Sequence, residues 1–191
     1  MRFNDHSRLA GSHALLSPSK YAWVNYDEEK LDAMVMTSFA AQRGTHLHDL
    51  AERMITLGVR LPDTTATLNQ YVNDAIGFRM TPEQMLFYSP NCYGQVDTIS
   101  YSKGKRKVPL LRIHDLKTGV TQCKMGQLKV YVALFCLEYG VKPGDIEIEM
   151  RIYQNDQVQI ESPDVVEIIQ IMDRIVFFDR RINQLREEVH G

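Results

Sequence analysis

Cysteine is scarce in this sequence of 191 residues, and its few thiols follow no metal-binding spacing. Cys92, Cys123 and Cys136 make an odd number, and no two of them form a CxxC pair. These absences exclude a disulfide framework, a zinc site of four cysteines and an iron–sulfur cluster held by four cysteines. We therefore expect three reduced thiols in or near the core.

Long apolar runs are absent as well, and neither sign of charge dominates. No stretch approaches the roughly 20 apolar residues of a membrane-spanning helix. The first residues, MRFNDHSRLAGSH, also lack the apolar segment of a signal peptide. We expect a cytoplasmic protein with no membrane contact. Because the net charge is −2, nucleic acid would have to bind through a local patch or a metal.

What the sequence does contain is a clear change of hydrophobic period. Apolar residues that recur about every 3.6 positions predict helices, and alternating apolar and polar residues predict strands. The order is helices, three strands, a helix, two strands and a helix, over residues 18–24, 32–57, 68–77, 84–89, 93–101, 108–118, 122–139, 146–154, 157–162 and 163–190. We predict one α/β (α+β) domain over residues 1–191, with a central mixed sheet of about five strands flanked by helices. Residues 1–13 are expected to form a flexible arm.

One predicted strand, in the stretch LLRIHDLKTG at residues 110–119, ends on charged residues. Asp97 lies nine residues before Arg106, near the middle of the predicted turn, and Asp115 lies nine residues after it. In a regular hairpin the two aspartates would face each other, with Cβ atoms roughly 5 Å apart. Lys117 shares a face with Asp115, because side chains alternate along a strand. Two carboxylates this close repel unless a cation lies between them, and their oxygens suit Mg²⁺ or Mn²⁺.

Two helical pairs accompany the aspartates. His48 and Glu52 are four residues apart and share a helix face, as do Gln127 and Tyr131 on the helix after Lys117. A competing match to the acidic-x-Lys pattern, Glu28-Glu29-Lys30, lies in a charged run with no apolar strand before it. That setting favours a solvated surface.

Read in order, the motifs are GTxxH from Gly44, GxxD from Gly94, DxK-TG from Asp115 and QxxxY from Gln127. Their order and spacing resemble the PD-(D/E)XK nuclease superfamily, and specifically its RecB-like exonuclease branch. The stand-alone phage or prophage type without an iron–sulfur cluster fits best. The match runs from Gly44 to Tyr131, about half the chain. The resemblance implies a restriction-endonuclease-like αβββαβ core.

The resemblance also implies a metal site and a catalytic set. His48, Asp97 and Asp115 would bind Mg²⁺ or Mn²⁺, with the backbone carbonyl of Leu116 as a further ligand. Asp97, Asp115 and Lys117 would form the catalytic set, in which the lysine acts on the attacking water or on the transition state.

Residues around this set are given supporting roles by the same resemblance. Gln127 and Tyr131 would orient the DNA or the active site. Glu52 would interact with the metal ligands without binding the metal itself. The stretch KGKRK at residues 103–107 is read equally well as a phosphate-tracking patch or as a solvated hairpin tip.

The leading hypothesis is a metal-dependent deoxyribonuclease, an exonuclease that acts in phage DNA recombination or processing. A single-strand annealing protein or a recombinase would be its partner. Two alternatives stay open: a non-catalytic DNA-binding or adaptor module on the same fold, and a structure-specific endonuclease. Phe177 and Phe178 widen the apolar surface of the C-terminal helix, which leaves a homo-oligomer open as well.

Overall fold

The computed structural model describes residue 8 and residues 14–103 and 108–190. The chain divides into two compact units, residues 1–45 and 46–191, and each is described by itself. The second unit holds the whole sheet, with every predicted site residue. The single domain over residues 1–191 stays a prediction. The predicted arm lies outside the described residues, apart from Arg8.

The first unit contains the short 3₁₀ helix η2, Pro18–Asn25, and the beginning of the long helix α1, Glu28–Leu57. Helix α1 begins four residues before the predicted start at residue 32. The side chain of Asp27 accounts for the earlier start, because its Oδ1 accepts a hydrogen bond from the backbone of Lys30 at 2.8 Å. The helix ends in the second unit, where Gly58 adopts a φ of 67°.

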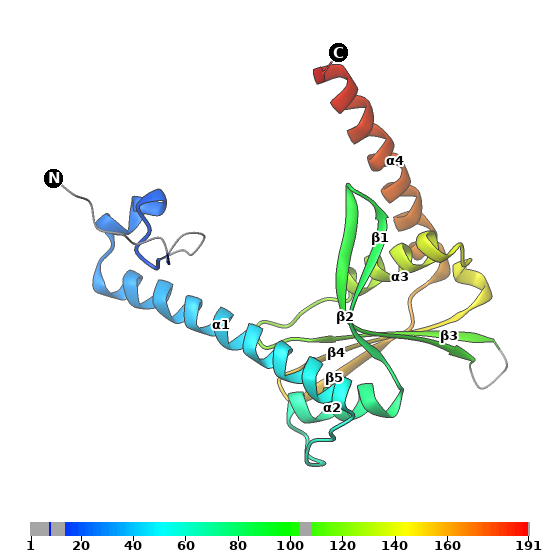
Figure 1. Ribbon diagram of the computed structural model, residues 1–191, viewed down its shortest axis with the longest axis horizontal. Helices are drawn as coiled ribbons and strands as arrows, with labels where there is room; N and C mark the ends of the chain where they lie inside the picture. Colours follow the sequence, from blue (N-terminus) through cyan, green and yellow to red (C-terminus); the bar gives the residue numbers. More distant parts are fainter. Residues whose placement is uncertain (1–7, 9–13, 104–107, 191) are drawn as a thin grey trace. The chain divides into compact units, whose positions relative to one another are not determined.

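The second unit is built on a five-stranded mixed sheet, as the sequence predicted (Figure 1). Strands β1, β2 and β3 form an antiparallel meander, β4 pairs parallel to β3, and β5 returns antiparallel. The elements are α2 Thr67–Gly77, β1 Thr81–Ser89, β2 Cys92–Lys103, β3 Pro109–Leu116, α3 Gly126–Tyr139, η3 Pro143–Asp145, β4 Glu147–Gln154, β5 Gln157–Glu161 and α4 Val165–His190. The α/β class with helices flanking a central sheet is therefore confirmed.

Helices cover both faces of the sheet, and each face carries its own core. On one face, Ile113 of β3 and Met150 of β4 pack with α3 and α4. On the other face, Leu116 of β3 and Tyr153 of β4 pack with α2 and with Ala51 and its neighbours on α1. Strand β3 is thus buried on both sides, so a charged side chain near its end is costly unless it has a partner.

The β4–β5 hairpin turns at Asn155 and Asp156, as the sequence predicted. Both residues have positive φ values, 51° and 57°, which is the conformation that a two-residue hairpin turn requires. Asp156 also reaches α2, since its Oδ1 accepts a hydrogen bond from the backbone of Thr67 at 2.8 Å. The turn therefore fixes the first residue of α2 as well as the strand register.

Helix α3 begins at Gly126, four residues after the predicted start at residue 122. The buried side chain of Gln154 holds the preceding loop in a non-helical form. Its Nε2 donates to the carbonyls of Gly119 and Thr121 at 2.6 and 2.7 Å, and its Oε1 accepts from the backbone of Cys123 at 3.1 Å. These bonds fix the connection between β3 and α3.

Two further sequence predictions concern a basic stretch and the absence of a membrane-spanning helix. The phosphate-tracking stretch, residues 103–107, lies outside the described residues except for the backbone of Lys103. Within the described ranges, none of the helices is both long enough and apolar enough to cross a membrane.

Candidate active site

The register of the β2–β3 hairpin brings Asp97 and Asp115 to adjacent positions. Thr98 pairs with His114 and Ile99 with Ile113, so the next position along the ladder sets Asp97 opposite Asp115. The backbone N–H of Leu116 donates to Asp97 Oδ2 at 2.8 Å. This bond anchors the Asp97 carboxylate at the end of β3.

Asp115 is the most deeply buried carboxylate of the group, with 3% of its surface exposed. Its burial, and after that the charge of Asp97, raise its pKa to about 6. Lys117 Nζ lies 3.0 Å from Asp115 Oδ2, yet this buried oxygen receives no donor of good hydrogen-bond geometry among the described residues. The carboxylate is therefore held in a charged form at a cost that a cation would relieve.

Lys117 is a cation at neutral pH in this arrangement. Burial works to lower its pKa, but the Asp115 carboxylate outweighs burial, and the pKa of Lys117 stays above its ordinary value. Its side chain is about one quarter exposed, 27%. An ammonium at this position is suited to stabilise negative charge on a phosphate that binds beside it.

Three side chains, those of His48, Glu83 and Asp97, lie close enough together to bind one metal ion. One ligand atom of each lies within 4.8 Å of the others, and His48 Nδ1 is 3.5 Å from Asp97 Oδ2. His48 lies on the same face of α1 as Ala51 and Ile55, which are buried against α2 and the sheet. This packing places the imidazole beside Asp97; the role of His48 as a metal ligand stays a prediction. Asp115 adjoins the triad and does not belong to it.

Glu83 is the functional candidate that the sequence reasoning missed. It lies between the pairs Pro82–Thr98 and Gln84–Val96, opposite Asp97, and its φ of 51° interrupts the regular strand. Burial, and after that the charge of Asp97, raise its pKa. Extending the first predicted strand back by one residue would have included it, although its positive φ takes it out of the regular alternation.

Gln127 and Tyr131 connect Lys117 to β2 through a chain of hydrogen bonds. Lys117 Nζ donates to Gln127 Oε1 at 3.1 Å, Gln127 Nε2 donates to the Tyr131 hydroxyl at 3.3 Å, and that hydroxyl donates to the carbonyl of Gln95 at 2.6 Å. The structure therefore brings both helical residues to the lysine, which the i, i+4 spacing alone could not establish.

Gly94 explains why the GxxD pattern needs its glycine. A Cβ atom at this position would lie 3.0 Å from Tyr131 Cε1, tighter than ordinary van der Waals contact. The tyrosine ring therefore packs directly on the backbone of β2. A larger residue at Gly94 would require the Tyr131 ring to shift by a few tenths of an ångström.

The remaining predicted residues lie near the site in different ways. Glu52 is exposed on α1, and its charge contributes to the raised pKa of Glu83. The Leu116 side chain is buried in the second core, while its N–H binds Asp97. The role of the Leu116 carbonyl as a ligand stays a prediction.

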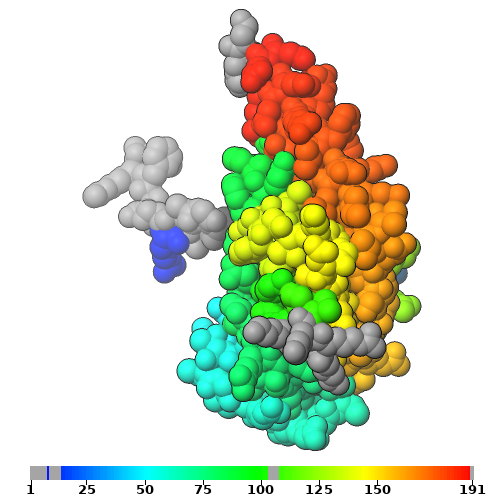
Figure 2. Space-filling model, turned by 90° about the vertical axis from the view of Figure 1, so that its right-hand side faces the viewer, coloured from blue at the N-terminus to red at the C-terminus, as the bar shows by residue number. Residues whose placement is uncertain are grey.

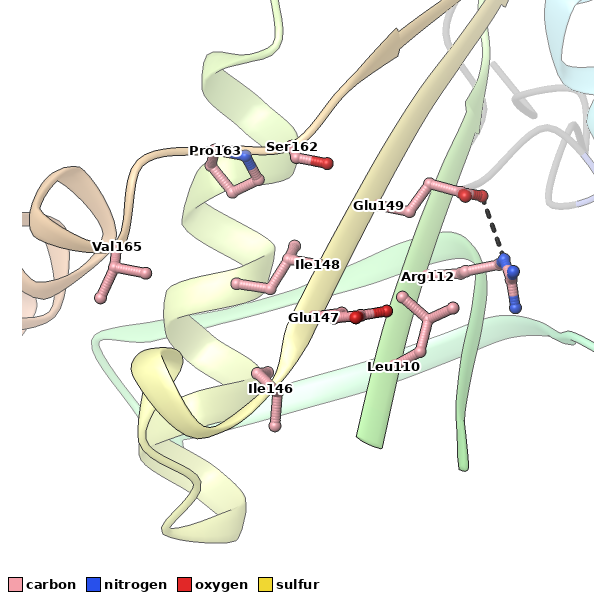
Figure 3. A pocket seen from close by; sticks show the side chains of 9 residues that line it. All are labelled: Leu110, Arg112, Ile146, Glu147, Ile148, Glu149, Ser162, Pro163 and Val165. Carbon is pink, nitrogen blue, oxygen red and sulfur yellow. Dashed lines mark hydrogen bonds and ion pairs between the residues drawn. The ribbon is translucent and has the colours of Figure 1, made fainter. Parts of the chain in front are cut away.

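A separate pocket of about 530 Å³ lies at the opposite end of β3 and β4 (Figure 3). Its lining combines apolar side chains with the ion pair between Arg112 Nε and Glu149 Oε1, 3.0 Å apart. Leu110, near the beginning of β3, and Ile146, directly before β4, also line it. Asp115 and Lys117 lie at the end of β3, so this pocket takes no part in the candidate active site.

The donor set suits a hard divalent cation. It offers one imidazole nitrogen and carboxylate oxygens from Glu83, Asp97 and Asp115, which are ligands that Mg²⁺ and Mn²⁺ accept. Burial, and after it the charge of Asp97, raise the pKa values of Glu83 and Asp115. We conclude that these residues fit Mg²⁺ or Mn²⁺, with His48 favouring Mn²⁺ of the two.

Comparisons with known proteins add little to this geometry. No family model and no curated protein matches the chain. The solved structure "Crystal structure of SSO0001" is 8% identical, with a TM-score of 0.34, over 59% of this chain and 57% of that chain. This likeness is too weak to carry an argument about fold or function.

Replacing Glu83 by Gln is expected to weaken Mn²⁺ binding by roughly tenfold or more, because it removes one anionic ligand from the triad. Asp49→Asn is the matched control. Asp49, next to His48 on α1, carries the same charge as Glu83 but lies outside the triad. Calorimetric titration with MnCl₂ measures both. If both variants lose the same affinity for Mn²⁺, Glu83 acts only through its negative charge and is not a metal ligand.

Proposed function

We propose that this protein is a metal-dependent DNA nuclease of the RecB-like PD-(D/E)XK type. One observation carries the proposal. The side chains of Asp97, Asp115 and Lys117 converge with those of His48 and Glu83, which come from the helix α1 and the strand β1. Residues from motifs far apart in the chain meet here, and each has the chemistry that phosphodiester hydrolysis needs.

The four ligand side chains would hold Mg²⁺ or Mn²⁺. When bound, the cation would neutralise the scissile phosphate and lower the pKa of a water molecule. Asp97 is fixed for this role by the Leu116 N–H. Asp115 would exchange part of its interaction with Lys117 for the cation, which frees the ammonium for the substrate.

Lys117 would stabilise the negative charge that develops on the phosphate in the transition state. Gln127 and Tyr131 would keep its long side chain in place, because they link Nζ to the backbone of β2. This positioning matters, since a free lysine side chain would have to be ordered at each turnover.

A non-catalytic DNA-binding module is the second candidate, and one observation disfavours it. A module that only binds DNA would not need a carboxylate that is 3% exposed beside a second carboxylate. Burying charge in this way lowers stability and is typical of catalytic sites. We therefore favour an enzyme, acting in the cytoplasm on phage or prophage DNA with an annealing protein or recombinase as partner.

An exonuclease is the favoured mode of attack. The sequence offers no element that reads bases, and a net charge of −2 disfavours tight binding along duplex DNA. A requirement for a free DNA end would restrain such an enzyme, since an intact circle has none.

Linear plasmid DNA is therefore expected to disappear in the presence of Mn²⁺ while the closed circular form of the same plasmid persists. The two forms are incubated in parallel and resolved on a gel. The Lys117→Ala protein, purified identically, controls for a contaminating nuclease. If the circle is linearised as fast as the linear substrate is consumed, the exonuclease mode is wrong and a structure-specific or non-specific endonuclease replaces it.

A further inference from the structure

Helix α4 carries an apolar repeat that is longer than the fold requires. Apolar residues recur at alternating intervals of three and four, which is the a/d pattern of a coiled coil. The members of this seam are Ile168, Ile171, Ile175, Phe178, Ile182, Leu185 and Val189. β-Branched residues occupy every a position, 168, 175, 182 and 189.

Only the first half of the seam is covered by the protein's own core. Ile168 is fully buried, and Ile171 and Ile175 pack against the cluster formed by α3 and the sheet. Within the second unit, α4 then runs on beyond α3 and the sheet (Figures 1 and 2). The later members are exposed: Phe178 50%, Ile182 37%, Leu185 42% and Val189 78%.

Charges on the two flanks of the exposed seam specify how a partner helix would lie. One flank carries Asp179 and Arg186 at e positions, and the other carries Arg181 and Glu188 at g positions. In a parallel pair, g of one helix faces e of the next heptad of the other, so Arg181 would face Arg186 of the second copy. Like charges directly opposed disfavour this arrangement.

An antiparallel pair turns the same charges into complementary contacts. When Ile182 of one copy packs against Leu185 of the other, Phe178 packs against Val189. The g positions then set Arg181 opposite Glu188, and the e positions set Asp179 opposite Arg186. Each contact occurs twice by symmetry, which gives four opposite-charge pairs around four apolar layers.

We propose that the exposed half of α4 is a self-association surface, on which a second copy of this chain docks its own α4 in antiparallel orientation. The proposal does not depend on the chemistry of the metal site, since none of these residues contributes to it. It commits to a C₂ dimer, in which residue 182 of each copy meets residue 185 of the other.

Two charges of the surface are already ordered in the monomer. Asp179 Oδ1 accepts hydrogen bonds from Ser89 Oγ and Asn91 Nδ2 at the β1–β2 turn. Arg181 Nη1 donates to Glu188 Oε1 along its own helix at 3.2 Å. Because these side chains are held on their flanks, docking would require less ordering of the surface.

Sedimentation velocity over a range of protein concentrations tests the surface. The parent chain is expected to dimerise, and Ile182→Glu is expected to raise the dissociation constant at least roughly 100-fold, because it buries an unpaired charge in the seam. Phe177→Glu is the matched control, since Phe177 is 64% exposed but lies off the seam at a c position. A monomeric parent, or an Ile182→Glu dimer as tight as that of the parent, would overturn the proposal.

A charge exchange tests the orientation with opposite outcomes for the two arrangements. In the antiparallel dimer, Arg181→Glu places a glutamate opposite Glu188 of the other copy, and symmetry repeats this contact. The change is therefore expected to raise the dissociation constant roughly tenfold. Adding Glu188→Arg to the same chain should restore parental affinity. In a parallel dimer Arg181→Glu would meet Arg186 and tighten association, so tightening by this single change contradicts the antiparallel arrangement.

Discussion

Lys117→Ala is expected to lower turnover on DNA by roughly two to three powers of ten, with little change in DNA affinity. The side chain is an ammonium held 3.0 Å from Asp115 and linked through Gln127 to Tyr131. Such a charge, fixed before the substrate arrives, interacts more strongly with the transition state than with the ground state. The loss should therefore appear in kcat and not in KM.

Lys124→Ala is the matched control for this result. Lys124 lies in the same loop between β3 and α3 and is exposed, so its removal takes the same charge from the same region. Single-turnover rates with saturating protein and end-labelled DNA compare the two variants with the parent. If both lysines affect turnover equally, or if Lys117→Ala retains the parental rate, the chemistry lies elsewhere.

Asp115→Asn is expected to make the metal-free protein more stable while weakening its response to Mn²⁺. Folding raises the pKa of Asp115 from 3.8 to about 6, so the native state binds this proton more tightly than the unfolded chain does. Stability is therefore lost as the pH rises from about 4 through 6. At pH 8 the ionised side chain costs roughly 3 kcal/mol relative to the unfolded chain, and the neutral amide removes most of that cost.

Thermal melts at two pH values test this prediction. Without metal at pH 8, Asp115→Asn should melt several degrees above the parent, and at pH 5 the difference should shrink because the parental carboxyl is protonated. Mn²⁺ should raise the melting temperature of the parent more than that of the variant, by mass action. A variant that melts below the parent at pH 8, and gains as much stability from Mn²⁺ as the parent does, would contradict the assignment.

The sequence was sufficient to place Asp97 opposite Asp115, because a hairpin centred near residue 106 fixes the register by counting. Alternation then placed Lys117 beside Asp115, and helical spacing paired Gln127 with Tyr131. These inferences depend on regular backbone, where position along the chain determines position in space. The observed register of β2 and β3 agrees with the first of them.

The residues that escaped prediction lie where the backbone is irregular or where the contact is distant in sequence. Glu83 has a φ of 51° within β1, so alternation gives no guide to its neighbours. Gln154 holds a loop more than 30 residues away through its side-chain amide, and this tertiary contact moves the start of α3 to Gly126. Neither feature has a local signal, because each is created by the packed fold.

The most direct test of the central claim is the release of nucleotides from end-labelled linear DNA, single- and double-stranded, by the parent and by Asp115→Asn. We expect release by the parent with Mn²⁺ or Mg²⁺, no release when EDTA removes the cation, and no release by the variant under any condition. Absence of release by folded parent protein that binds Mn²⁺, or equal release by both proteins, would contradict it.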